Sequence, residues 1–157
     1  MIVTEAELVR WGRSIGQSAR PPLFLGLAGP LGAGKSVLAR AVASGAGVTG
    51  AVPSPTFNLL FRYEGRPGIQ VVHLDLYRLT TPEELWELGW EELGAENDVV
   101  LVEWPAQAGD LLPDDRWEIR LFPEPDDPML RRVEVERVGL PHPLPGFPVE
   151  VTGEPVQ

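Results

Sequence analysis

The sequence reads Gly-Pro-Leu-Gly-Ala-Gly-Lys-Ser at residues 29–36. This stretch matches the pattern G-x-x-x-x-G-K-[ST], whose glycines let backbone N–H groups turn inward and line a concavity of the size of an anion. The apolar run 23–28 precedes it, and a run of helix-forming residues follows it from Val37. Strand, loop and helix in this order predict a phosphate-binding loop whose helix directs its N-terminus at the phosphates.

The end of this loop supplies the first candidates for nucleotide contact. Lys35 is expected to reach the β- and γ-phosphates, and the Ser36 hydroxyl is placed to bind Mg²⁺. Of the 13 lysine and arginine residues in the chain, Lys35 is the one lysine, and a phosphate loop needs a compact ammonium on a flexible stem. A glycine-rich turn without a ligand is the alternative. The candidate nucleotide-binding residues of this segment are Gly32, Ala33, Gly34, Lys35, Ser36 and Val37.

Secondary-structure signals continue on both sides of the loop. Thr4 and Glu7 fit a capping box, and apolar residues then recur at helical spacing, which predicts a helix over about residues 5–18. A third helix is expected over about residues 81–88, with Pro82 at its first position and Gly89 at its end. Strands are expected at residues 23–28, 58–63, 69–77, 98–103, 117–122 and 130–138.

This order of elements predicts the fold class and the domain boundary. The fold is expected to be a single P-loop NTPase-like α/β domain, with a mixed, mostly parallel sheet flanked by helices and an antiparallel edge formed by the last two strands. The domain is expected over residues 1–138. Five prolines and almost no periodicity from Gly139 onward predict a C-terminal tail, residues 139–157, that is extended or disordered.

Composition excludes several classes of protein. The net charge is −10, whereas a protein that binds nucleic acid by itself carries a basic face, so RNA is expected to be reached only through a partner. The absence of cysteine excludes disulfides and thiolate metal sites. No apolar run approaches the ~20 residues of a membrane span, and the N-terminus lacks a secretion signal, so no membrane association and a cytoplasmic location are expected.

Two acidic residues compete for one role at the phosphate end. Alternation along the strand at 69–77 places His73, Asp75 and Tyr77 on one side. Glu103 ends an apolar strand, and in P-loop proteins an acid at that place binds Mg²⁺ or polarises the attacking water. Asp75 and Glu103 are therefore both candidates, and the pattern does not rank them.

Two further segments permit a functional and a structural interpretation. Thr56 lies in the loop 54–57, whose position resembles a switch segment that senses the γ-phosphate, although a proline turn is the simpler interpretation. Trp86 and Trp90 are expected to be packing residues, with an exposed patch for a partner as the alternative. A solvated acidic face is expected nearby, with a docking surface for a basic partner as the alternative; its members are Glu83, Glu84, Glu87, Glu91 and Glu92.

Several motifs occur together in a fixed order. They are Gly32-Ala33-Gly34-Lys35-Ser36, Ser54-Pro55-Thr56-Phe57, His73-Leu74-Asp75-Leu76-Tyr77-Arg78-Leu79, Glu84-Leu85 with Leu88-Gly89, and Glu103-Trp104-Pro105. This arrangement resembles the bacterial TsaE (YjeE) family, the ATPase of the tRNA threonylcarbamoyladenosine pathway, over about residues 4–137. Pro30 stands where the family often has an acidic residue, and Ser36 stands where threonine is commoner. Proline still permits the turn and serine keeps the hydroxyl, so neither departure disturbs the implied mechanism.

The resemblance implies an activity and partners. A member of this family binds ATP and Mg²⁺ and hydrolyses ATP weakly without its partners. It acts with TsaB and TsaD, which attach a threonylcarbamoyl group to adenosine 37 of tRNAs that read codons beginning with A. The tRNA is then reached only indirectly, through the complex.

The resemblance also implies roles for particular residues. Ser36 and Glu103 would hold Mg²⁺, and Asp75 and Thr56 would complete the catalytic phosphate end together with Glu103. The residues carried over as nucleotide contacts outside the loop are Trp104, which would support the phosphate end, and Thr4 and Arg131, which would lie near the adenosine end.

Other P-loop functions remain as alternatives or are excluded. A small-molecule kinase on the same fold needs a second substrate pocket and usually an arginine-bearing lid, and no arginine-rich insertion is present. A GTPase of the common type reads guanine with an N-K-x-D element. Since Lys35 is the one lysine and lies in the phosphate loop, that element is excluded.

Overall fold

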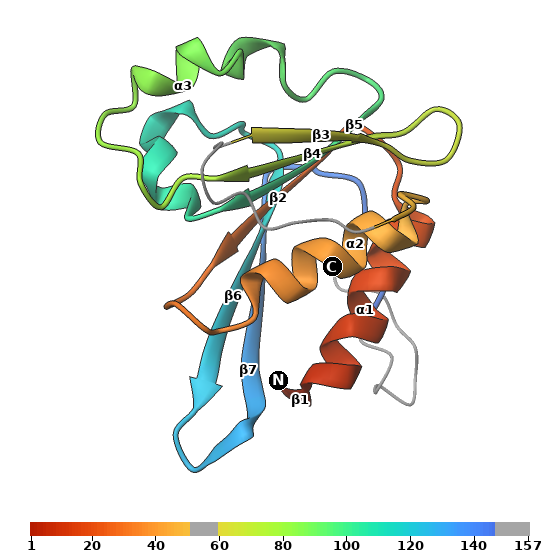
Figure 1. The fold of residues 1–157 in the computed structure, drawn as a ribbon, viewed down its shortest axis with the longest axis vertical. Coiled ribbons are helices and arrows are strands. Elements are labelled where there is room, and N and C mark those ends of the chain that lie inside the picture. Colours follow the sequence, from red (N-terminus) through yellow and green to blue (C-terminus); the bar gives the residue numbers. More distant parts are fainter. Residues whose placement is uncertain (51–59, 147–157) are drawn as a thin grey trace.

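The computed structural model describes residues 1–50 and 60–146, which form a seven-stranded sheet in the order β1-β7-β6-β2-β5-β4-β3 (Figure 1). The strands are β1 (Ile2–Thr4), β2 (Leu23–Ala28), β3 (Leu60–Glu64), β4 (Gln70–Asp75), β5 (Asp98–Glu103), β6 (Arg116–Glu124) and β7 (Asp127–Val138). The four central strands β6, β2, β5 and β4 are parallel. The predicted class, a mixed and mostly parallel α/β sheet, is therefore confirmed.

The sheet has antiparallel strands at both edges. β7 pairs antiparallel with β6, as expected from the alternation of the last two strands, and β3 pairs antiparallel with β4 at the other edge. The sequence pattern did not indicate β1, a three-residue strand that extends the first edge by pairing Ile2 with Arg132 and Thr4 with Leu130.

The first two helices lie side by side on one face of the sheet (Figure 1). They are α1 (Glu5–Ser18) and α2 (Lys35–Gly45). The predicted capping box is present: the Glu7 N–H donates to Thr4 Oγ1 at 3.1 Å, and the Thr4 N–H donates to Glu7 Oε1 at 2.9 Å. The α1 side chains of Trp11 and Ile15 are fully buried, and they belong to the larger apolar core, which lies on this face of the sheet.

Where α1 and α2 cross, a glycine permits their close approach and one arginine binds carbonyls of both helices. A Cβ on Gly16 would lie 2.1 Å from the Val42 carbonyl oxygen, so only glycine permits this approach. The Arg66 guanidinium, from the turn between β3 and β4, donates to the carbonyls of Gly16 at 2.8 Å and Ala19 at 3.1 Å, and to Gly45 at 3.4 Å. A cation at two helix C-termini satisfies carbonyls that have no partner within the helix.

The opposite face carries shorter helical turns. These are α3 (Glu84–Glu87) and the 3₁₀ turns η1 (Trp90–Glu92) and η2 (Pro105–Leu111), which cover a second apolar cluster. The predicted helix over residues 81–88 is wrong in length, because α3 has only four residues. Its flanks are i→i+3 turns, such as Leu85 N–H to the Pro82 carbonyl, and Gly89 at φ 80° ends it. So short a segment does not offset the cost of helix nucleation.

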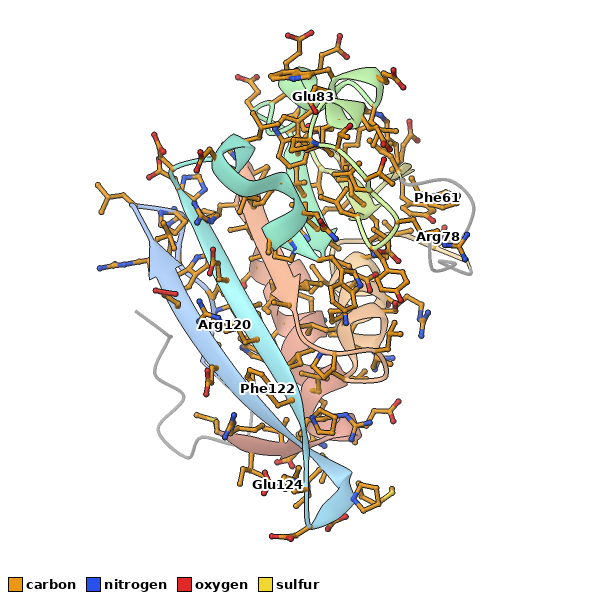
Figure 2. The ribbon with its side chains drawn as sticks, turned by 90° about the vertical axis from the view of Figure 1, so that its left-hand side faces the viewer. Phe61, Arg78, Glu83, Arg120, Phe122 and Glu124 are labelled. Atoms are coloured by element: carbon orange, nitrogen blue, oxygen red, sulfur yellow. The ribbon has the colours of Figure 1, made fainter. Side chains whose placement is uncertain are left out.

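Part of the sheet on this face carries no helix. Figure 2 shows Arg120 and Phe122 of β6 on the uncovered side, where Arg120 pairs with Glu118 at 2.9 Å and Glu136 at 2.7 Å. Arg132 of β7 lies 4.8 Å from the centre of the Phe122 ring. Ion pairs and an arginine that lies over a phenylalanine ring are typical of a strand surface that faces water.

After β7 the chain runs back over the domain as far as residue 146. The Trp117 indole N–H donates to the His142 carbonyl at 2.7 Å, the Trp11 indole N–H donates to the Pro145 carbonyl at 2.9 Å, and Leu144 is buried in the larger core. The proposed boundary at residue 138 and the tail over 139–157 stay predictions. In the described part of the chain, none of the helices is long and apolar enough to cross a membrane.

Candidate nucleotide-binding site

Three neighbouring parallel strands bring the predicted loop and both predicted acids to one edge of the sheet. β2 leads into the loop 29–36, β5 ends at Glu103, and β4 ends at Asp75, which is paired in register with Glu103. Carboxyl ends of parallel strands are where α/β sheets bind ligands. The loop 29–36, Glu103 and Asp75, which separate sequence patterns had singled out, are therefore neighbours in space.

The loop has the backbone shape that its glycines predict. Gly29, Gly32 and Gly34 have φ angles of 142°, 79° and 108°, a region that residues with a Cβ rarely adopt. Gly34 caps α2 without any side-chain hydrogen bond. First-turn N–H groups have no acceptor within a helix, so an anion is the natural partner for this end of α2.

Lys35 is buried behind the loop. Its ammonium donates to the carbonyls of Gly29 at 2.5 Å and Pro30 at 2.9 Å, and it lies 4.2 Å from the centre of the Trp104 ring. Burial lowers the pKa of the Lys35 ammonium below its ordinary value, and the charges of Glu103 and Asp75 oppose that shift. The ammonium is thus held at the inner wall of the loop by neutral acceptors and a ring face.

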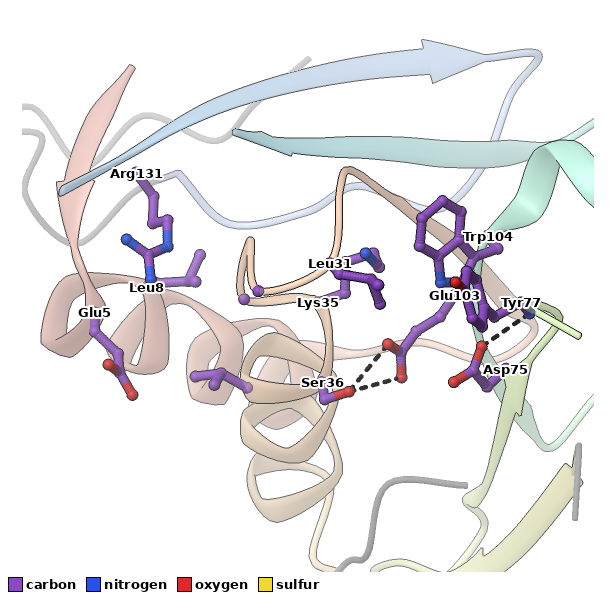
Figure 3. Close-up of a pocket in the computed structure, with 13 residues that line it drawn as sticks. Glu5, Leu8, Leu31, Lys35, Ser36, Asp75, Tyr77, Glu103, Trp104 and Arg131 are labelled. Atoms are coloured by element: carbon purple, nitrogen blue, oxygen red, sulfur yellow. Dashed lines mark hydrogen bonds between the residues drawn. The ribbon is translucent and has the colours of Figure 1, made fainter. Parts of the chain in front are cut away.

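Ser36 and Glu103 are in direct contact. The Ser36 hydroxyl lies 3.0 and 3.2 Å from the two carboxylate oxygens of Glu103 (Figure 3). Oε2 of Glu103 also lies 2.7 Å from Nε2 of His73, and both of these side chains are buried. His73 therefore fixes the orientation of the carboxylate that faces Ser36. Nδ1 of His73 is buried and has no hydrogen-bond partner among the described residues.

Asp75 lies beside Glu103 in a more open position. Its Oδ1 accepts the Tyr77 N–H at 3.0 Å. Burial raises the pKa of the Asp75 carboxyl, the Glu103 charge adds to this, and the Tyr77 N–H, His73 and Lys35 oppose it. Two carboxyl groups side by side favour a cation between or in front of them.

Trp104 forms the wall at the phosphate end. Its φ of 60° is the one positive φ of a non-glycine residue in the parts of the chain that the structure describes. A residue held in this uncommon conformation often lies at a functional site. The Trp104 ring is tilted against the Tyr77 ring at 5.0 Å between centres, so it lies between the Lys35 ammonium and an exposed tyrosine.

A pocket of about 300 Å³ joins these groups to a second end of the site. At that end it is lined by Glu5 and Leu8 from α1 and by Arg131 from β7 (Figure 3). The Arg131 Nε donates to the Ala33 carbonyl at 3.1 Å, which fixes the guanidinium against the outside of the loop. The pocket therefore runs from an acidic, aromatic end across the loop to a second end between α1 and β7.

Most of the predicted site residues meet at this pocket. Those that line it are Gly32, Gly34, Lys35, Ser36, Val37, Asp75, Glu103, Trp104 and Arg131. Ala33 is buried under the loop and contributes its carbonyl to Arg131, and Thr4 caps α1 next to Glu5 without lining the pocket. Thr56 and its loop lie outside the described residues, so its role stays a prediction.

The sequence patterns missed part of the lining. Glu5 and Leu8 reach the pocket from α1, and Leu31 is an exposed side chain of the loop itself. No local signal marks Glu5 and Leu8, because they reach the site only through the pairing of β1 with β7 and the packing of α1 beside the loop.

The oxygen ligands at this site fit a Mg²⁺ ion that is bound jointly by the protein and by a phosphate. They do not fit a metal ion that is held by protein side chains alone. In the described residues, no group of three or more His, Asp or Glu side chains could hold a metal ion. Mg²⁺ usually keeps several waters and binds one or two protein oxygens plus substrate phosphates. The Ser36 hydroxyl and the Glu103 carboxylate are such a pair, and they face each other beside a loop built for an anion.

Comparisons with known proteins point to one family. Residues 2–133 match the model of the family described as threonylcarbamoyl adenosine biosynthesis protein TsaE. A protein of Rickettsia bellii named tRNA threonylcarbamoyladenosine biosynthesis protein TsaE is 35% identical over 134 residues, which are 85% of this chain and 92% of the relative. The protein of that name from Treponema pallidum is 32% identical over 108 residues, 69% of this chain and 78% of the relative.

A solved structure shares the fold. The crystal structure of Bacillus subtilis YdiB superposes with a TM-score of 0.71 at 26% sequence identity, and the match covers 88% of this chain and 84% of that one.

Proposed function

Because the chain belongs to the TsaE family, whose role is in the biosynthesis of threonylcarbamoyladenosine in tRNA, we propose that it binds ATP with Mg²⁺ and hydrolyses ATP as a subunit of the modifying complex. The observation that carries the proposal is the contact of Ser36 with Glu103 beside the loop amine of Lys35. A hydroxyl, a carboxylate and an ammonium at the end of one anion-binding loop are the parts that phosphoryl transfer requires.

Each residue has a proposed part in that reaction. The loop amides and Lys35 bind and orient the phosphates, and the Ser36 hydroxyl and Glu103 hold Mg²⁺. Mg²⁺, when bound, neutralises charge that develops on the phosphate oxygens. His73 keeps the Glu103 carboxylate aimed at Ser36 through the 2.7 Å contact. Asp75 supports the same end and orients water, with Thr56 from the neighbouring loop.

The other end of the pocket is the proposed place of the adenosine. Arg131 and Glu5 offer a donor and an acceptor there, and Leu8 offers an apolar surface for a base. Thr4 acts indirectly, because its capping of α1 positions Glu5.

We also propose the partners and the cellular place. The chain acts in the cytoplasm with TsaB and TsaD in threonylcarbamoylation of adenosine 37 in tRNAs that read codons beginning with A. Hydrolysis by the isolated chain is weak and increases when these partners are present. The tRNA is bound by the complex and not by this chain, whose net charge is −10.

The two acids provide the test. Glu103→Gln keeps the acceptor for Ser36 but loses the charge, so ATP should bind as well as before or better, while partner-stimulated turnover should fall by about a hundredfold. Asp75→Asn should reduce both to a smaller degree, since its oxygen still accepts the Tyr77 N–H. The measurements are ATP affinity by calorimetry and phosphate release with TsaB and TsaD present.

Full turnover in Glu103→Gln would show that the catalytic carboxylate is on the other strand. Full turnover in both variants would remove both acids from the metal site and leave only the nucleotide-binding part of the proposal. Arg40→Ala is the control, because Arg40 is an exposed residue of α2 outside the pocket.

A further inference from the structure

A second pocket lies at the opposite end of the parallel strands. Its volume is about 590 Å³, and it is lined by the start of β2, by residues of α3 and η1, by the segment before β6 and by residues 140–142. The two pockets share no lining residue. The whole length of β2, six residues or about 20 Å, separates this pocket from the phosphate loop.

Two tryptophans line this pocket; one is buried and held by its neighbours, and the other is exposed. Trp90 is 8% exposed, its indole N–H donates to the Leu111 carbonyl at 3.1 Å, and its ring meets the Phe24 ring edge-on at 6.0 Å. Trp86 is 48% exposed. The Trp86 ring is thus open to a ligand in the pocket that Trp90 also lines, and Leu140, 81% exposed, adds apolar surface to the same pocket.

The rim of the pocket is acidic. Glu91, Asp114 and Asp115 line it, all three are exposed, and no arginine or lysine is among the lining residues. In the part of the chain that the structure describes, none of these carboxylates takes part in an ion pair. Further acids continue along α3 and η1, namely Glu83, labelled in Figure 2, and Glu84, Glu87 and Glu92.

Aromatic faces beside unpaired carboxylates recognise a cation on an apolar stem. An arginine guanidinium stacks on tryptophan and pairs with carboxylates in the same plane, and lysine satisfies the same requirement less specifically. We propose that this second pocket, a groove lined by Trp86, Trp90, Glu91 and Asp114, docks an arginine- or lysine-bearing segment of a protein partner. The proposal rests on the proposed function in one respect: the partner is a member of the modifying complex.

The acidic rim of the groove excludes three other occupants: a nucleic acid, the chain's own residues 147–157 and a second copy of this chain. A nucleic acid would bring phosphates to an acidic rim. Residues 147–157 of this chain carry Glu150 and Glu154 and no lysine or arginine, so the chain's own C-terminus has the wrong sign. A second copy has a net charge of −10 and would meet the first against long-range repulsion.

The position of the groove has a consequence for assembly. Because it lies at the far end of β2 from the phosphate loop, the partner segment and the nucleotide bind at the same time without competing for a residue. Substitutions in the groove should therefore change the affinity for partners and leave the affinity for ATP unchanged.

The test uses two kinds of groove variant and a charge-matched control. Glu91→Lys combined with Asp114→Lys reverses the rim, and Trp86→Ala removes the exposed ring. The control is Glu124→Lys combined with Asp126→Lys at the tip of the β6–β7 hairpin, which changes the net charge by the same amount at a distant place (Figure 2 labels Glu124).

The affinity of each full-length variant for TsaB and TsaD is measured by calorimetry at low and at high salt, beside its affinity for ATP. Both groove variants should bind the partners about tenfold more weakly or worse, which is about 1.4 kcal/mol or more. The hairpin control should bind as the wild type does, and ATP affinity should be unchanged in all. A photo-crosslinking residue at position 86 should label a partner peptide that contains arginine or lysine.

Three results would overturn the proposal. Groove variants that assemble like the wild type would remove the groove from the interface while leaving the proposed ATPase function intact. A wild-type dimer that Trp86→Ala dissociates in light scattering would make a second copy the occupant. Failure of the wild type to bind either TsaB or TsaD, with ATP binding intact, would refute both the proposed partnership and this docking site.

Discussion

At the scale of single residues, the site depends on how three polar groups are held before any ligand arrives. Lys35 is fixed by two loop carbonyls and the Trp104 ring, and Glu103 is fixed by Ser36 and His73. Groups that are already oriented do not have to be ordered at the moment of binding.

The first prediction concerns Lys35. Lys35→Ala removes the ammonium, and Lys35→Arg puts a planar fork where the wall made by the Gly29 and Pro30 carbonyls fits a compact ammonium. We expect ATP affinity or turnover to fall at least about tenfold in both variants, or about 1.4 kcal/mol. Calorimetric titration with ATP and Mg²⁺ measures this, with Arg40→Ala as the control. Unchanged binding and turnover in both Lys35 variants would mean that the loop does not bind phosphate.

The second prediction concerns the stability cost of Asp75. Since its folded-state pKa lies above the free value of 3.8, its charged form destabilises the fold above the folded-state pKa. Asp75→Asn keeps the acceptor for the Tyr77 N–H and removes this cost, so it should raise the melting temperature at neutral pH.

The sign of the pH dependence follows from the same shift. The difference in melting temperature between Asp75→Asn and the wild type should be largest at neutral pH. It should shrink as the pH falls through the folded-state pKa and vanish below 3.8, where the carboxyl is protonated in both states. Thermal unfolding of both proteins across this range measures it; a difference that grows on acidification would contradict a raised pKa.

Single residues were predictable from sequence where one strand or loop sets their position. Asp75 and Glu103 were both found as strand-end acids, but only the register of β4 beside β5 shows that they are neighbours, and only side-chain packing shows that Ser36 and His73 both contact Glu103. The contact of Arg131 with the loop joins residues 98 positions apart, so no local pattern could show it.

At the scale of elements, short-range chemistry explains which predictions succeeded. The start of α1 was predictable because the capping box lies within four consecutive residues, Thr4 to Glu7. The helix expected over residues 81–88 carried good start and stop signals, yet it formed mostly i→i+3 turns, because Leu85 is its one buried residue and tertiary packing supplies most helix stability.

The third prediction concerns the crossing of α1 and α2. Gly16→Ala would place a methyl group 2.1 Å from the Val42 carbonyl oxygen and 2.5 Å from the Ala46 nitrogen, so the helices must separate. We expect a loss of about 1–3 kcal/mol or more. For a chain of this size that is a fall in melting temperature of roughly 2–4 °C per kcal/mol.

Gln17→Ala is the matched control, since Gln17 is the next residue of the same helix and is exposed. Its stability should stay within about 0.5 kcal/mol of the wild type. Equal stability of Gly16→Ala and the wild type would show that the backbones do not approach as closely as the structure has them.

At the scale of the whole molecule, charge and topology set what the chain does alone. Its acids outnumber its bases by ten. Three arginines of β6 and β7 pair with glutamates: Arg116 and Arg132 pair along their own strands, and Arg120 pairs with Glu118 of β6 and with Glu136 of β7. The mixed sheet was predictable from the order of elements, because buried strands around a phosphate loop indicate parallel pairing. Strand β1, which extends the first edge, was not predictable, because it has only three residues and its partners lie at 130–132.

The fourth prediction concerns tRNA. Because its net charge is −10, the isolated chain should bind tRNA only weakly, and the binding should not depend steeply on salt. Titration of labelled tRNA at several salt concentrations, with and without TsaB and TsaD, measures this. Tight, salt-sensitive binding by the chain alone would mean that its arginines gather into a basic face despite the net charge of −10.

The pairing of β1 with β7 also bears on the order in which the chain is completed during synthesis. Residues 2–4 are synthesised well before their partners at 130–132, because 126 to 130 positions separate the two residues of each pair. At about 5–20 residues per second, they wait roughly 6–26 s for those partners. During that time α1 and the phosphate loop exist without Arg131, so the end of the pocket between α1 and β7 lacks one wall. The nascent chain therefore acquires the complete lining of this pocket only after β7 has been synthesised.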